Sequence, residues 1–382
     1  MVGTGNTKLI QEEAVLDHCP NVKTRDRVID VLRGWFILMM VTSHVGYGSI
    51  LNKISHFPNL VSAAGGFVFL SGMVLGMVSF QRIRREGEQS CYRRLLHRAG
   101  LIALIHYIIT FTWAILHQYT SLGAGIPNAA YFGGWPAVSL LILTFRYQPQ
   151  YLDILPLYVF FILLTPICLW MMVRKYSILL LGLSIIGYIS VMVRPDMLSL
   201  NNKVFGSEAF HLLAWQFLFV LALCIGYYRN YLVNDVWRKH KRLILIGVVG
   251  FTCVMFVLAQ FERHGVPARL HPFSEYWLYQ LFERSELRIG RLLYLLGTLF
   301  TAYLWLHHLD IKGKHYAPLA MLESLGQRSL YCFQLHIWLL LVVLCMHWNY
   351  LTGIQLDALV FINLAIIYWM NKYRVLSKII PN

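Results

Sequence analysis

The chain has 382 residues, of which 58% are hydrophobic and only 13% are charged. Soluble domains carry about 25% charged residues, so this composition excludes an ordinary soluble protein and indicates a chain that crosses a membrane several times. The formal net charge of +15 does not indicate nucleic-acid binding, because the basic residues follow the predicted membrane topology. The seven cysteines show no CxxC spacing, so we predict neither a metal site nor a disulfide framework.

Ten apolar segments predict an all-α fold, a polytopic transmembrane helical bundle with about ten spans. The expected spans are about 31–51, 60–80, 99–117, 152–173, 177–193, 210–228, 243–261, 289–308, 328–347 and 356–371. With both termini in the cytoplasm, 24 of the 33 lysines and arginines fall on the inner side and eight in outer loops. The positive-inside rule favours this orientation, with a cytoplasmic N-terminal tail (1–28), a transmembrane domain (29–373) and a cytoplasmic C-terminal tail (374–382). The polar first 24 residues predict no cleavable signal peptide.

The first span carries Asp30, Arg33 and His44. Eleven residues of α-helix advance about 1100°, within about 20° of three full turns, so Arg33 and His44 share one face. The rise between them is roughly 16 Å, so we expect Arg33 at the membrane surface and His44 near the middle of the membrane. A neutral imidazole there could act as a general base on a hydroxyl. The alternative is that His44 only hydrogen-bonds a neighbouring helix.

The second span carries several small residues, namely Gly65, Gly66, Ser71, Gly72 and Gly76. They would admit a thin ligand, although close packing of another helix is the simpler explanation. The following basic loop, from Arg82 to Arg98, suits the phosphates of a cytoplasmic donor. Its alternative is ordinary positive-inside charge or contact with anionic lipids.

Two long outer segments, 118–151 and 262–288, are rich in aromatic and polar residues, which suits either a sugar or a membrane-interface belt. Within the first, the apolar stretch 136–145 is too short to span and is expected to be interfacial or re-entrant. Asp153 opens the fourth span, where it could orient an imidazole or simply cap the helix. Ser329 and His336 share a face of the ninth span, but no acid lies nearby and we predict no serine triad.

Several of these motifs together resemble the OpgC family of integral membrane proteins. They are Asp30-x-x-Arg33-Gly with His44, Phe67-Val-Phe-Leu-Ser71-Gly72, Arg146-Tyr-Gln-Pro with Leu152-Asp153-Ile-Leu-Pro156, Ala214-Trp-Gln, and Leu325-Gly-x-x-Ser329-Leu. The family is related to acyltransferase family three, whose motif of Arg, ten residues and His is matched by Arg33 and His44. That larger group usually has Arg-x-x-Arg entering the third span, whereas Arg94 and Arg98 are four apart here.

The resemblance implies an O-acyltransferase that moves an acyl group from cytoplasmic acyl-CoA to a sugar hydroxyl across the bacterial inner membrane. For OpgC proteins the implied reaction is succinylation of osmoregulated periplasmic glucan, with succinyl-CoA as donor, no metal and no nucleic acid. Membrane lipids and a glucan or other glycan acceptor are the expected partners, and a homo-oligomer stays open. The implied catalytic residues are His44, Asp153 and Arg33, the donor-binding residues Arg33, Ser71, Arg93, Arg94 and Arg98, and the acceptor-binding residues Arg146, Trp215, Gln216 and His336.

Three questions stay open at the level of sequence. The sugar hydroxyl could attack the thioester directly, or the acyl group could first pass to His44. A proton-coupled transporter or flippase of a glycan or lipid-linked substrate would use His44 and Asp153 differently, and a purely structural membrane subunit would need neither. Glucan-dependent cleavage of a thioester by the purified protein distinguishes an enzyme from both.

Overall fold

A computed structural model describes residues 25–57, 61–119, 129–147, 149, 151–194, 210–264, 280–283, 286–311, 316–346 and 351–375. All regular structure in these ranges is helical. The longer helices are α2 (Arg27–Val45), α4 (Ala63–Glu86), α5 (Glu88–Tyr119), α7 (Ile154–Val173), α8 (Ser177–Val193), α9 (Leu212–Tyr227), α11 (Arg238–His264), α13 (Ile289–Ile311), α14 (Ala317–Gln327), α15 (Ser329–Cys345) and α16 (Ile354–Lys372). Shorter ones are α3 (Ile50–Ser55), η1 (Ala129–Phe132), α6 (Trp135–Leu143), α10 (Arg229–Tyr231) and η3 (Leu232–Trp237).

The helices confirm an all-helical membrane protein but not the number of spans. Within the described ranges, seven helices are long and apolar enough to cross a membrane, or eight if the bent pair α14 and α15 counts as one span. Each predicted span overlaps at least one helix, yet α8 and α9 have only 17 and 16 residues. The count of about ten is therefore not confirmed. Residues 120–128, 148 and 150 of the first long outer segment, and 265–279, 284 and 285 of the second, lie outside the described residues. In the first segment the short apolar stretch forms α6.

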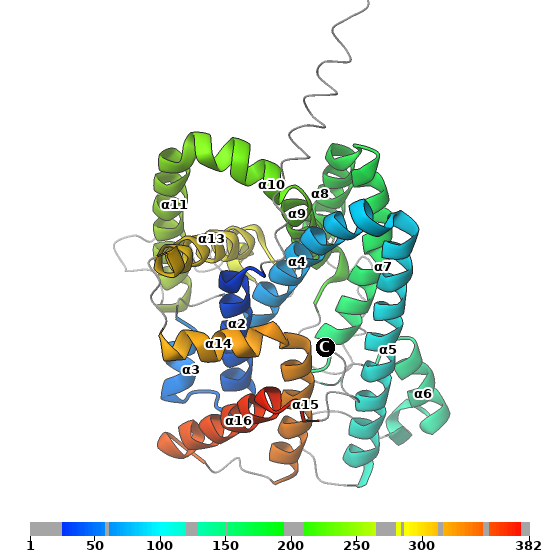
Figure 1. The fold of residues 1–382 in the computed structure, drawn as a ribbon. Helices are drawn as coiled ribbons and strands as arrows, with labels where there is room; N and C mark the ends of the chain where they lie inside the picture. The colour runs from blue at the N-terminus through cyan, green and yellow to red at the C-terminus, as the bar shows by residue number, and fades with distance from the viewer. Residues whose placement is uncertain are drawn as a thin grey trace, which may run out of the picture.

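Helix α2 occupies the centre of the bundle, and α14 lies across it (Figure 1). Asp26 caps its start by accepting from the backbone N–H groups of Val28 and Ile29. The helix ends at Val45, where Gly46 and then Gly48, with φ +86°, turn the chain away. The expectation of one span to about residue 51 is therefore wrong, and His44 lies in the last turn of α2 rather than in the middle of a span.

The crossing of α2 and α14 depends on two glycines. A Cβ added at Gly34 would collide with the carbonyl oxygen of Leu322, and one at Gly326 with the carbonyl oxygen of Asp30. The two helix backbones therefore touch directly, and neither obstacle is a side chain that could rotate away. This close approach fixes the height of α14 against the first helix.

We expect Gly34→Ala to destabilise the protein by at least about 1–3 kcal/mol, because overpacking against rigid backbone forces the helices apart. The measurement is thermal unfolding of the purified protein in detergent, followed by monomer loss on size exclusion. Gly100→Ala on α5 is the matched control, since an added Cβ there meets nothing within 4 Å. A Gly34→Ala variant as stable as the control would show that the α2–α14 crossing is not close-packed.

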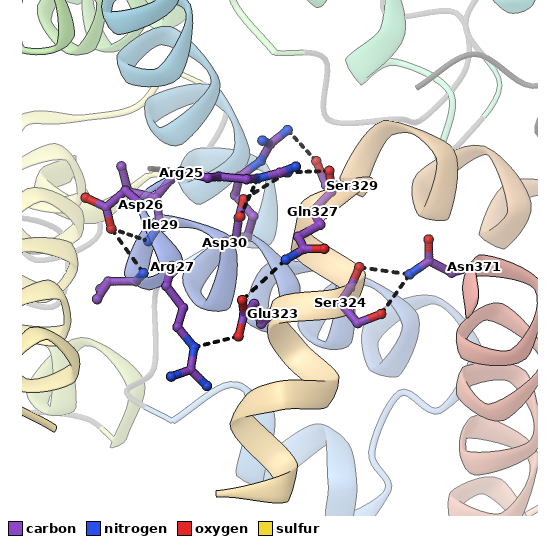
Figure 2. Close-up of polar contacts among 12 residues, drawn as sticks. Arg25, Asp26, Arg27, Ile29, Asp30, Glu323, Ser324, Gln327, Ser329 and Asn371 are labelled. Atoms are coloured by element: carbon purple, nitrogen blue, oxygen red, sulfur yellow. Dashed lines mark hydrogen bonds and ion pairs between the residues drawn. The ribbon is translucent and has the colours of Figure 1, made fainter. Parts of the chain in front are cut away.

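A polar network ties the start of α2 to the end of α14 (Figure 2). Arg25 pairs with Asp30 at 2.5 Å and also donates to the carbonyl oxygen of Gln327 at 2.5 Å. Arg27 pairs with Glu323 at 2.6 Å. Asp30 thus binds Arg25, which precedes the first residue of α2. The network fixes the point where α14 ends, and the chain bends there by 89° into α15.

The basic helix ends gather on one side of the bundle. The end of α7 meets the start of α5 through Arg174 and Glu88, and Arg229 after α9 pairs with Asp26. Arg328, at the start of α15, donates to the carbonyl oxygen of Asn371 near the end of α16. Helix α5 runs beside α7 on the opposite side of the molecule from α11 (Figure 1). Residues of α2, α5 and α7 help to line the cavity of the candidate site.

Candidate active site

Arg33 lies where α2 meets the start of α15. Its Nη2 donates to the Ser329 hydroxyl at 2.5 Å, an interaction made possible by the sharp bend at Arg328. The Arg33 Nε is buried and has no hydrogen-bond partner among the described residues. A buried guanidinium with spare donors is costly unless an anion or polar group occupies the space beside it.

A cavity of about 200 Å³ opens beside Arg33 and is lined by four arginines, Arg33, Arg82, Arg94 and Arg98. Three hydroxyl groups also face it, those of Ser71, Tyr158 and Ser329, and the remaining lining is apolar. Tyr158 donates to Ser71 Oγ at 3.0 Å. Guanidinium groups and hydroxyls between apolar walls suit an anionic molecule with an uncharged tail.

The cavity extends along α4 from Arg82 to Phe67. Those 15 residues of helix correspond to about 22 Å. The lining also includes Ile154, at the start of α7, and Phe333 on α15. Phe333 lies one turn before His336, and Ile154 lies three residues after Tyr151. Near these two lining residues along the chain stands a group of aromatic and imidazole rings that do not themselves line the cavity.

That group consists of His44, His336 and Tyr151. The Nδ1 of His44 and the Nε2 of His336 are 2.9 Å apart, a hydrogen bond between α2 and α15. The two imidazole rings are stacked with centroids 5.1 Å apart, and the Tyr151 ring lies 4.4 Å from that of His44. His336 is fully buried. Burial raises the pKa of the Tyr151 phenol above its usual value, so this ring stays neutral beside His44.

The predicted donor residues fall into two groups. Arg33, Ser71, Arg94 and Arg98 line the cavity together, whereas Arg93 is exposed and is not part of the lining. Arg82, in the basic loop, and Tyr158, on α7, also line the cavity but were not predicted as donor-binding residues. Ser329, for which no serine triad was predicted, accepts a hydrogen bond from Arg33.

Asp153 takes the N-cap position of α7, but its side chain makes no capping hydrogen bond. Its role in orienting His44 stays a prediction. Tyr151, two residues earlier, is the member of this segment whose ring lies against His44. Tyr151 has φ +76°, a backbone conformation that is unusual for tyrosine, and it turns the chain just before α7. Sequence spacing gave no signal for that contact.

The predicted acceptor residues do not form one group. Gln216 joins α9 to α8, accepting from Ser184 Oγ at 2.8 Å and donating to the Ser184 carbonyl oxygen. Trp215 is fully buried and packs edge-on against Phe210. Arg146 is exposed beyond α6. His336 alone is brought to His44, so acceptor binding by the other three residues stays a prediction.

The fold and this site define a helical membrane protein with a basic cavity lined in part by α2 and α15, the same two helices that carry a pair of hydrogen-bonded histidines. Among the described residues, no group of three or more His, Cys, Asp or Glu side chains could hold a metal ion. The family model described as OpgC protein matches residues 25–378, and the chain belongs to the OpgC family. This membership suggests a glucan-modifying acyltransferase. No curated protein and no solved structure matches the chain.

Proposed function

We propose that this protein is an O-acyltransferase that moves a succinyl group from cytoplasmic succinyl-CoA to a hydroxyl group of periplasmic glucan. One observation carries the proposal: four arginines line one cavity, and α2 and α15, which help to line it, also carry the hydrogen-bonded pair His44 and His336. Family membership supports the reaction class. The succinyl group, the CoA carrier and the glucan acceptor are inferred from the family resemblance together with this chemistry.

The donor fits the cavity by the character of its parts. Its phosphates would lie among the four cavity arginines, Arg33, Arg82, Arg94 and Arg98, whose planar guanidinium groups can make paired charge-assisted hydrogen bonds. The two amides of the pantetheine arm would hydrogen-bond the hydroxyls of Ser71 and Tyr158. The thioester then reaches the apolar end, close to His44. The helical rise of roughly 16 Å from Arg33 to His44 leaves room for an extended arm.

The transfer step needs one base. His44 takes the proton of a sugar hydroxyl, and the oxygen attacks the thioester carbonyl carbon. The C–O bond forms and the C–S bond breaks, and the departing sulfur takes the proton back from the His44 imidazolium. The products are a sugar ester and free CoA thiol. Prior transfer of the acyl group to His44 gives the same products and stays open.

The two substrates come from opposite sides in this proposal. The basic ends of the helices face the cytoplasm, as the distribution of lysine and arginine favours. His44, in the last turn of α2, then lies toward the outer side. The glucan would reach it from the periplasm, so neither substrate has to cross the membrane completely.

The experiment that tests the function uses full-length protein purified in detergent, succinyl-CoA and isolated glucan. We expect release of CoA thiol that depends on glucan and is matched by succinyl esters on the glucan. Glucan or proton movement in proteoliposomes without any CoA release would overturn the proposal in favour of the transporter alternative.

A further inference from the structure

The contact between His44 and His336 has a chemical consequence for the base. The pair joins α2 and α15 through one hydrogen bond of 2.9 Å between His44 Nδ1 and His336 Nε2. His336 is 0% exposed, and its neighbours Leu335, Ile337 and Leu340 are also buried. The ring that meets His44 is therefore held rigidly by the core of the bundle.

Two neutral imidazoles can share only one proton across such a contact. If His44 supplies it, the Nε2 of His44 carries a lone pair and can accept a proton from a hydroxyl. If His336 supplies it, His44 is protonated on Nε2 and cannot act as a base. The direction of this hydrogen bond therefore decides whether His44 can act as a general base on the sugar hydroxyl.

The other nitrogen of His336 leaves this direction adjustable. His336 Nδ1 is buried and has no hydrogen-bond partner among the described residues. No hydrogen bond at Nδ1 therefore fixes which nitrogen of His336 carries the proton. In many histidine sites a carboxylate bonded to the second nitrogen does fix it. A sugar hydroxyl that donates to His44 Nε2 selects the tautomer in which His44 donates through Nδ1 to His336.

We propose that His336 is a positioning residue that accepts the Nδ1–H of His44 and so presents the Nε2 of His44 to the acceptor hydroxyl. This inference rests on the proposed transfer by His44. Once His44 has taken the proton, the same contact becomes a charge-assisted hydrogen bond and stabilises the imidazolium. Complete burial of His336 favours this role over direct contact with the glucan.

Two substitutions separate hydrogen bonding from packing. In His336→Gln the side-chain amide oxygen can take the place of Nε2 as an acceptor, whereas His336→Leu fills the space without one. We expect the leucine variant to lose about 10²-fold in kcat, since misplacing a catalytic group by about 1 Å can cost that much, with donor KM unchanged. The glutamine variant should recover most of that loss. Gln334→Leu is the control, because Gln334 is buried on the same helix and should leave kcat unchanged.

The decisive comparison combines the variants. In a His44→Gln background, His336→Leu should cause no further loss, because His336 acts only through His44. Additive losses would overturn the inference, as would a folded His336→Leu variant as active as the glutamine variant. If His44→Gln itself keeps normal transfer, the base assigned under the proposed function is wrong, an outcome distinct from failure of His336 alone.

Discussion

Replacing His44 by glutamine should lower the turnover number by about 10²- to 10⁴-fold while the donor still binds. That range is the usual contribution of a general base, and glutamine keeps a hydrogen-bonding group of similar bulk in the last turn of α2. The measurement is the steady-state rate of ester formation on glucan, with donor KM determined for both proteins. Both should elute as the same species on size exclusion.

His56→Gln is the matched control for this experiment. His56 is also a partly buried histidine next to the first helix, but its ring nitrogens are engaged locally. Its Nε2 contacts Ser43 Oγ at 2.7 Å, and its Nδ1 contacts the Asn52 carbonyl oxygen at 3.0 Å. It lines no part of the arginine cavity, so transfer should continue at the normal rate. A folded His44→Gln variant with near-normal transfer would instead assign His44 to helix packing.

Neutralising the arginines of the cavity should raise the KM for succinyl-CoA by about 10-fold or more. A charge-assisted hydrogen bond contributes about 1.5–3 kcal/mol, and Arg33, Arg94 and Arg98 are placed to make such bonds to phosphates. The variants are single changes to alanine, and KM for glucan should not move.

The control is Arg85→Ala, on the same helical hairpin but exposed and outside the cavity lining. It tests whether any loss of positive charge near the membrane surface weakens donor binding. An unchanged donor KM in all three cavity variants would leave these arginines as determinants of membrane topology only.

The helices were predictable because apolar runs of membrane length leave the chain few alternatives to hydrogen-bonding itself. The small residues of α4 had two possible explanations, helix packing and ligand contact. Gly72 and Gly76 lie against the carbonyl oxygens of Phe219 and Leu223 on α9, as the packing alternative required. Ser71, immediately before Gly72, faces the cavity, as the ligand alternative required. The packing alternative is therefore confirmed at Gly72 and Gly76, while ligand contact at Ser71 stays a prediction.

The site itself was only partly predictable. Arg33 and His44 belong to one helix, so their spacing could be calculated from the sequence. His336 is 292 residues from His44, and no local pattern connects positions so far apart. The break between α14 and α15 depends on contacts such as that of Arg25 with Gln327, which come from distant segments. Tertiary packing, rather than any local propensity, places Ser329 and His336.

The most direct test of the account uses proteoliposomes that hold glucan inside and receive labelled succinyl-CoA outside, with the basic side of the protein facing out. Protease cleavage of a terminal tag selects the preparations with this orientation. The account predicts succinyl esters on the enclosed glucan, formed by the wild type and lost in His44→Gln, while free succinyl-CoA stays outside. Esters that form only when donor and glucan are on the same side, or equally well with His44→Gln, would contradict transfer across the membrane by His44.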